Sequence, residues 1–134
     1  MDIFKYTAFF HDGAITDIKH DENGIEFFMK SAEMDIEDIV DDKIILTKDN
    51  RIKGILHIEG IKNIKIDDNH FFGLIEKKYD RGKIFDFEMK KNSVELSIDW
   101  VNFPPKLQIN EFTNIKIEAD KIYWVKIPNL SDDE

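Results

Sequence analysis

The chain has 134 residues, no cysteine, and a formal net charge of −9 from 28 acidic and 19 basic side chains. Its length fits a single domain with one core, and the lack of cysteine excludes disulfides, thiolate chemistry and cysteine-based zinc sites. The acidic balance argues against nucleic acid and anionic lipid as partners, because both are bound largely through Lys and Arg. Three explanations of the negative charge remain: binding of a basic protein, binding of a cation, or solubility alone.

The first residues do not resemble a secretory signal. Residues 1–6 carry an acid at Asp2 and lack a basic region followed by an apolar run. Elsewhere no apolar run approaches the length of a membrane span. We expect a cytoplasmic protein in which residues 1–134 form a single β-rich domain and residues 128–134 form a frayed acidic tail.

The N-terminal part of the chain predicts a hairpin. An aromatic-rich stretch, residues 3–10, fits a short helix or a strand and leads into a turn signal at residues 11–13. Residues 14–20 and 25–30 then alternate apolar and polar side chains. Between them Asn23-Gly24 favours a type I′ turn, because both residue types tolerate positive φ angles.

Residues 31–42 have a different character. Six acids lie between Glu33 and Asp42 without a Lys or Arg among them. Ile36, Ile39 and Val40 have helical spacing, so a single helical turn is one interpretation. An acidic loop or strand extension is an equal alternative.

The clearest strand period lies in residues 44–66. Isoleucine, leucine and glycine occupy one parity from Ile44 to Ile66, while mostly polar residues occupy the other. This stretch predicts one or two strands with one apolar face and one wet face. Other elements must cover the apolar face.

The second half predicts two further hairpins. Residues 85–89 and 94–100 alternate regularly around a turn at residues 90–92, and residues 115–124 form a last pair of strands turning near Asp120. With little helix predicted, we expect a mainly β fold, either an antiparallel β-sandwich or an open curled barrel built from hairpins. The strands with the cleanest alternation should share one core, formed by Leu56, Ile58, Phe85, Phe87, Leu96, Ile98 and Trp100.

Two sets of polar residues are candidates for function. The dipeptides His11-Asp12 and His20-Asp21, with Asp17 between them, offer imidazole and carboxylate groups suited to a metal or to acid–base chemistry. Turn formation by these acids is the favoured interpretation, and we expect no cofactor. The alternative metal site consists of His11, Asp12, Asp17 and His20.

The second set is the acidic stretch, whose density exceeds what turns or strand pairing require. We predict a partner-binding surface that meets a basic protein, with a solvated loop that protects neighbouring strands as the alternative. The predicted binding residues are Asp35, Glu37, Asp38, Asp41 and Asp42. Trp100, Phe103 and Trp124 belong either to the core or to the lining of a ligand cavity.

Residues 10–15 (Phe-His-Asp-Gly-Ala-Ile) and 54–61 (Gly-Ile-Leu-His-Ile-Glu-Gly-Ile), with alternating strands between them, form a loose pattern covering the first half of the chain. In this respect the chain resembles small bacterial β-rich proteins, some of which are grouped with the immunity proteins of polymorphic toxin systems. The resemblance implies a small cytoplasmic protein that binds a toxin, and it carries no catalytic residues over.

These observations lead to a non-enzymatic protein-binding domain as the expected function. The alternative is a β-barrel that binds a small ligand or a metal and acts as an enzyme through the His11 and His20 cluster. A structural subunit that dimerises through a strand edge is a third possibility.

Overall fold

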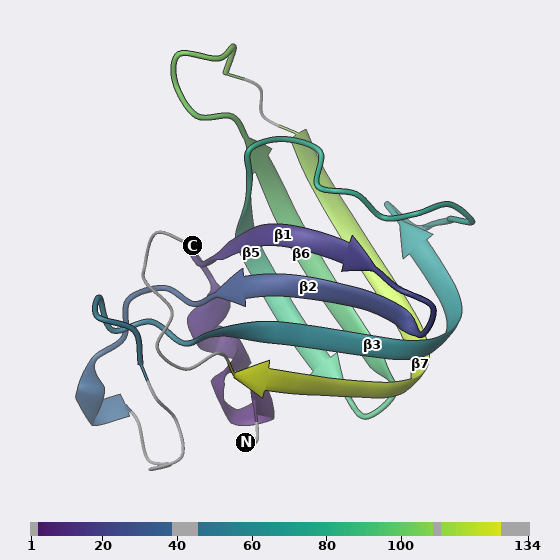
Figure 1. Ribbon diagram of the computed structural model, residues 1–134, viewed down its shortest axis with the longest axis horizontal. Coiled ribbons are helices and arrows are strands. Elements are labelled where there is room, and N and C mark those ends of the chain that lie inside the picture. Colours follow the sequence, from purple (N-terminus) through teal and green to yellow (C-terminus); the bar gives the residue numbers. More distant parts are fainter. Residues whose placement is uncertain (1–2, 39–45, 109–110, 127–134) are drawn as a thin grey trace.

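The chain forms a closed antiparallel β-barrel (Figure 1). The computed structural model describes residues 3–38, 46–108 and 111–126. Six strands follow one another around the barrel in the order β2-β1-β5-β6-β7-β3, and β2 pairs with β3 to complete the ring. The strands are β1 (Ala14–His20), β2 (Gly24–Lys30), β3 (Lys53–Ile66), β5 (Arg81–Lys90), β6 (Ser93–Val101) and β7 (Glu111–Lys126), with the short β4 (Asn69–His70) added to the end of β3. The mainly β prediction is confirmed, and the barrel is closed rather than open.

The two longest strands bend around the barrel. β3 and β7 contain 14 and 16 residues and pair from Gly54 opposite Lys126 to Ile66 opposite Ile115. The predicted hairpin turning near Asp120 is wrong, because β7 continues through this residue as one strand paired with β3. Their register shifts between Ile61 and Asn63, and such a bulge increases the local bend and twist. In Figure 1 both strands therefore pass from the layer of β1 and β2 into the layer of β5 and β6.

The central stretch begins its strand later than the alternation predicted. β3 starts at Lys53, and residues 47–50 form a turn in which the Asn50 amide donates to the Thr47 carbonyl at 3.0 Å. Asn50 has a φ of 62°, a conformation that asparagine tolerates better than most residues. Residues 44–45 lie outside the described residues, so the strand prediction there stays a prediction.

The barrel interior is filled by large apolar side chains. Leu56, Ile58, Phe87, Leu96, Ile98 and Trp100 are all buried, as predicted from the alternation. The 3₁₀ helix η1 (Ile3–Phe10) packs against one end of the barrel (Figure 1). Its Phe10 ring meets the rings of Phe87 and Trp124 edge to face, with centroids 5.3 and 5.5 Å apart, an arrangement favoured by the aromatic quadrupoles.

The prediction that Phe85 belongs to this core is wrong. Its side chain is 57% exposed. The ladder between β5 and β6 shifts between Ile84 and Asp86, so one extra residue stands on β5. Strict alternation fails at such a bulge because two consecutive side chains turn outward.

The first hairpin is confirmed, but its turn is not of type I′. Neither Asn23 nor Gly24 has a positive φ. The Asp21 carboxylate instead accepts hydrogen bonds from the amides of Asn23 and Gly24 at 2.7 and 2.9 Å, a typical Asx-turn arrangement. Gly24 is required for another reason: a Cβ there would lie 1.8 Å from the carbonyl oxygen of Ile58 on β3.

Replacement of Gly24 by alanine tests this close approach of β2 to β3. We expect Gly24→Ala to lower the free energy of unfolding by about 1 to 3 kcal/mol in chemical denaturation, because the strands must separate locally. Gly73→Ala is the matched control, since a Cβ there meets the movable ring of Phe71 at 3.1 Å. Equal stability of the two variants would contradict the close approach.

The bulge in β5 is tested by a pair of neighbouring truncations. Phe87→Ala should destabilise the protein by about 3 to 5 kcal/mol, because the ring fills the core. Phe85→Ala should cost less than about 1 kcal/mol, since it removes only partly exposed ring contacts with Phe112 and His11. Thermal denaturation of both variants is the measurement. Equal losses of stability would show that β5 alternates without a bulge.

Candidate functional site

The connection between β2 and β3 carries the predicted acidic surface. These strands are hydrogen-bonded neighbours, yet residues 31–52 join them. A hairpin between adjacent antiparallel strands usually needs two to five residues, and much longer connections are commonly functional. We call residues 33–42 within this connection the acidic segment.

The described acids of this segment face solvent. Glu33, Asp35, Glu37 and Asp38 are all exposed. Asp35 precedes the single 3₁₀ turn η2 (Ile36–Asp38), which is closed by a hydrogen bond from the Asp38 amide to the Asp35 carbonyl at 2.9 Å. Asp41 and Asp42 lie outside the described residues, so their part in this surface stays a prediction.

No opposite charge meets these carboxylates within the part of the chain that the structure describes. The ion pairs found there involve other acids, among them Asp49, Asp80, Glu111 and Asp120. The described acids of the acidic segment therefore present negative charge to the solvent, without an ion-pair partner among the described residues.

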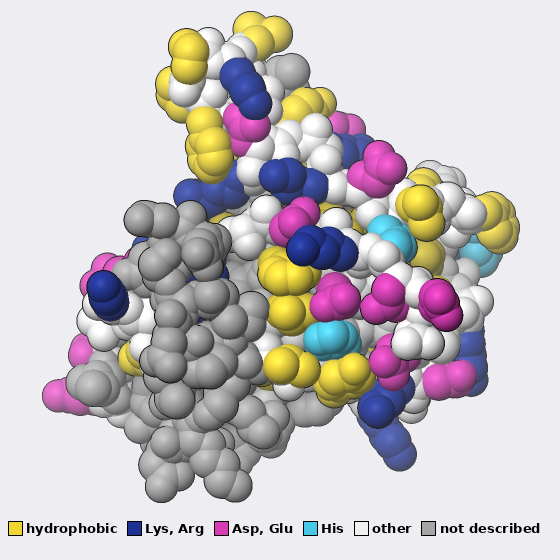
Figure 2. Space-filling model, viewed as in Figure 1, with side chains coloured by type: hydrophobic (Ala, Val, Ile, Leu, Met, Phe, Trp, Pro, Cys, Tyr) yellow, Lys and Arg dark blue, Asp and Glu magenta, His cyan; other side chains and the backbone are white. Residues whose placement is uncertain are grey.

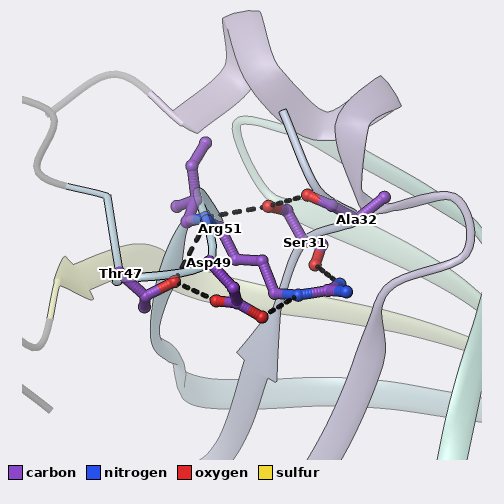
Figure 3. Close-up of polar contacts among 6 residues, drawn as sticks. Ser31, Ala32, Thr47, Asp49 and Arg51 are labelled. Carbon is purple, nitrogen blue, oxygen red and sulfur yellow. Dashed lines mark hydrogen bonds and ion pairs between the residues drawn. The ribbon is translucent and has the colours of Figure 1, made fainter. Parts of the chain in front are cut away.

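A polar network fixes the base of the acidic segment (Figure 3). Arg51 donates from Nε to the Asp49 carboxylate at 2.6 Å and from Nη1 to the Ser31 carbonyl at 2.9 Å. The Thr47 hydroxyl donates to the same carboxylate at 2.6 Å. Arg51 thus ties the two ends of the connection together, because Ser31 follows β2 directly and Arg51 lies two residues before β3.

Ser31 completes this base from inside the protein. Its buried hydroxyl accepts from the Ile52 amide and donates to the Ala32 carbonyl, both at 2.8 Å. The Met34 amide donates to the Asn50 carbonyl at 2.8 Å, and the Met34 side chain is buried in the core. The described acids consequently belong to a connection that is bonded and packed at both ends.

A histidine and a tyrosine are stacked on the outer face of β3 and β7. The rings of His57 and Tyr123 are parallel within 5°, with centroids 4.7 Å apart, and the Tyr123 hydroxyl donates to the Glu59 carboxylate at 3.2 Å. Burial and this hydrogen bond raise the pKa of Tyr123. Figure 2 shows on this face a histidine among hydrophobic side chains, with acidic side chains beside it. The stacked rings connect β3 to β7 on the outside of the barrel, since His57 and Tyr123 are directly paired in the ladder.

The structure does not assemble the alternative metal site. His11 and Asp12 precede β1 and His20 ends it, so the length of a seven-residue strand, roughly 20 Å, separates the backbone positions of the two histidines. Asp17 lies between them and accepts a hydrogen bond from the adjacent Ile18 amide at 2.9 Å. Within the described ranges no group of three or more His, Asp or Glu side chains has the geometry to hold a metal ion.

Each histidine of that set has a local structural contact instead. His11 Nδ1 is hydrogen-bonded to the Phe85 carbonyl, and His20 Nε2 is hydrogen-bonded to the Ile75 carbonyl at 2.7 Å. Asp12 lies 3.4 Å from the Lys83 ammonium and has a φ of 67°, as its turn requires. The spacing of these residues along the sequence therefore reflected turns at opposite ends of one strand.

The sequence-based interpretation missed the residues that hold the acidic segment. Arg51 is one of two arginines in the chain, and it stands close to Thr47 and Asp49 at the next turn signal. That cluster was a usable indication of a structured base. The three aromatic residues assigned either to the core or to a ligand cavity differ in burial. Trp100 and Trp124 belong to the core, whereas Phe103 is exposed.

Comparison with known proteins adds no relative from which a function could be carried over. No protein-family model, curated protein or solved structure matches the chain. Among the described residues, no helix combines the length and the apolar character needed to cross a membrane. The functional argument therefore depends on the geometry described above.

The anchoring role of Arg51 can be tested by amide hydrogen exchange. Arg51→Met removes the guanidinium but keeps an unbranched chain, and we expect exchange at Met34 and Asn50 to accelerate about tenfold or more as the base opens locally. Lys48→Met is the matched control, because it removes one positive charge from an exposed neighbour in the same turn. Unchanged exchange in Arg51→Met would show that the base is held without Arg51.

Proposed function

We propose that the chain is a non-enzymatic protein-binding domain that acts in the cytoplasm and engages a basic partner through the acidic segment. The observation that carries this proposal is the exposure of Asp35, Glu37 and Asp38 without an opposite charge among the described residues. The length of the connection adds support, since joining β2 to β3 does not require it.

The fixed base makes the segment suited to recognition. Binding costs conformational entropy when a loop must be ordered, and an anchored loop has less of this entropy to lose. Exposed carboxylates add long-range attraction, which accelerates encounter with a positively charged surface. Anchoring and charge therefore favour association with the same class of partner.

An immunity-like role is the sharpest form of the proposal. The resemblance to immunity proteins of polymorphic toxin systems supports a toxin as the partner. A toxin that acts on nucleic acid needs a Lys- and Arg-rich face to hold phosphates. An acidic inhibitor bound to that face would neutralise it and block access.

Neutralisation of the described acids tests the proposal. The segment variant is Asp35→Asn, Glu37→Gln and Asp38→Asn, and the control variant is Glu22→Gln, Glu88→Gln and Glu118→Gln, which removes equal charge from exposed acids elsewhere. We expect the segment variant to lose a basic protein that the immobilised parent captures from its native host at low salt. Both variants should melt like the parent, because exposed charges contribute little to stability.

Association kinetics with the captured protein then separate local from overall charge. The segment variant should associate more slowly, with a weaker dependence on salt, while its dissociation rate changes less. The control variant should resemble the parent. If the segment variant associates as fast as the control variant at low ionic strength, the acidic segment is a solvated loop and the proposal fails.

A further inference from the structure

A polar hollow of about 200 Å³ lies on the outer face of β3, β5, β6 and β7. Val94 on β6 and Ile117 on β7 line its base, and both side chains are buried in the barrel. Because successive side chains of a strand point to opposite faces, the residues on either side of these two face outward. Their charged groups are therefore accessible to a molecule in the hollow.

Four charged residues of the lining form one row across the strands. Lys65 on β3 is paired with Lys116 on β7, and Glu95 on β6 is paired with Glu88 on β5. Lys116 and Glu95 are paired with each other, and we call these four residues the charged row. Like charges directly opposite each other destabilise a sheet, and the row contains one such pair of each sign. A ligand with a negative group at the lysines and a positive group at the glutamates would compensate both pairs.

Within the described part of the chain, the two central charges of the row form no ion pair with each other. Lys116 Nζ donates to the Asp68 carboxylate at 3.0 Å, and the Asn114 amide group donates to the Glu95 carboxylate at 2.8 Å. The bond to Asp68 raises the pKa of Lys116, which keeps its ammonium group charged. Both side chains are thus directed to other partners, and no ion pair closes the hollow between them.

The two outer charges, Lys65 and Glu88, have no ion-pair partner among the residues that the structure describes. The row crosses the neighbouring strands β3, β7, β6 and β5. With adjacent strands about 4.8 Å apart, the centre of the lysine pair lies roughly 10 Å from the centre of the glutamate pair. A ligand that reaches both pairs must therefore carry its two charges at opposite ends of a short chain.

The next row of the ladder forms the second wall of the hollow. Glu118 on β7 and Lys90 on β5 belong to it, and Ser93 on β6 lies between them with a small side chain. The whole lining contains three lysines and three glutamates. A ligand with a single charge would meet as much repulsion as attraction there, so the lining favours a zwitterion.

We propose that this hollow binds a small zwitterion of the ω-amino acid class, with its carboxylate at the two lysines of the charged row and its ammonium group at the two glutamates. The site shares no residue with the acidic segment and does not depend on the proposed protein-binding function.

Three probes of similar length test the charge requirement. 6-Aminohexanoate carries both charges, hexanoate only the carboxylate, and hexylamine only the ammonium group. Titration of the ¹⁵N-labelled protein at low ionic strength, where exposed charges are least screened, should move the Ser93 and Lys116 amide signals saturably with 6-aminohexanoate. Hexanoate and hexylamine should bind about tenfold more weakly, since each lacks one set of charge-assisted hydrogen bonds. Glycine, whose two charges are adjacent, tests the spacing and should bind as weakly as these.

Neutralising one outer charge at a time tests the assigned residues. Lys65→Gln and Glu88→Gln should each lower the affinity for 6-aminohexanoate about threefold, the effect of one partly exposed charge pair. Neither variant should melt below the parent, because each removes one member of a like-charge pair. Lys77→Gln and Glu22→Gln are the matched controls, since both residues are exposed and lie outside the hollow; their affinities should equal that of the parent.

Any one of three results would overturn the proposal. The first is the absence of a saturable shift at Ser93 and Lys116 with 6-aminohexanoate. The second is equal affinity of the parent for 6-aminohexanoate and for glycine or a singly charged probe. The third is an affinity of either site variant equal to that of its control. The probe comparison uses the parent protein, so it decides the matter even if a variant does not fold.

Discussion

The pairing of β2 with β3 is the constraint on which the rest of the structure depends. Seven residue pairs, from Gly24 opposite Glu59 to Lys30 opposite Lys53, close the sheet into a ring. Closure provides both neighbours for each of these strands and encloses the apolar side chains in one interior. It depends on Gly24, where no Cβ fits against β3. The same seam brings Ser31 and Ile52 together, so closing the barrel also anchors the acidic segment.

The candidate site lies on a connection that the barrel holds in place. The acidic segment belongs to the connection across the β2–β3 seam, where Arg51 and Ser31 supply the anchoring bonds. This division is common in β folds, in which strands provide stability and connections provide recognition.

The sequence predicted the fold class and most of the core because those depend on local alternation. Leu96, Ile98 and Trp100 are buried as their parity requires. Phe85 was misplaced because alternation carries no sign of a bulge, and the late start of β3 depends on the turn at Asn50. Closure depends on pairing between distant strands, which periodicity does not encode. Thr113 lay outside the strand predicted from residue 115, so its place beside Trp100 emerged only from the structure.

Amide hydrogen exchange along β2 is the most direct test of closure. In antiparallel sheets the amides of a strand point alternately to its two neighbours. A strand between β1 and β3 should therefore show slow exchange at every amide from Ile25 to Met29, comparable with Leu96 in β6. If exchange alternated between slow and fast along these residues, β2 would be an edge strand. The barrel would then be open, and the base of the acidic segment would lose the seam that anchors it.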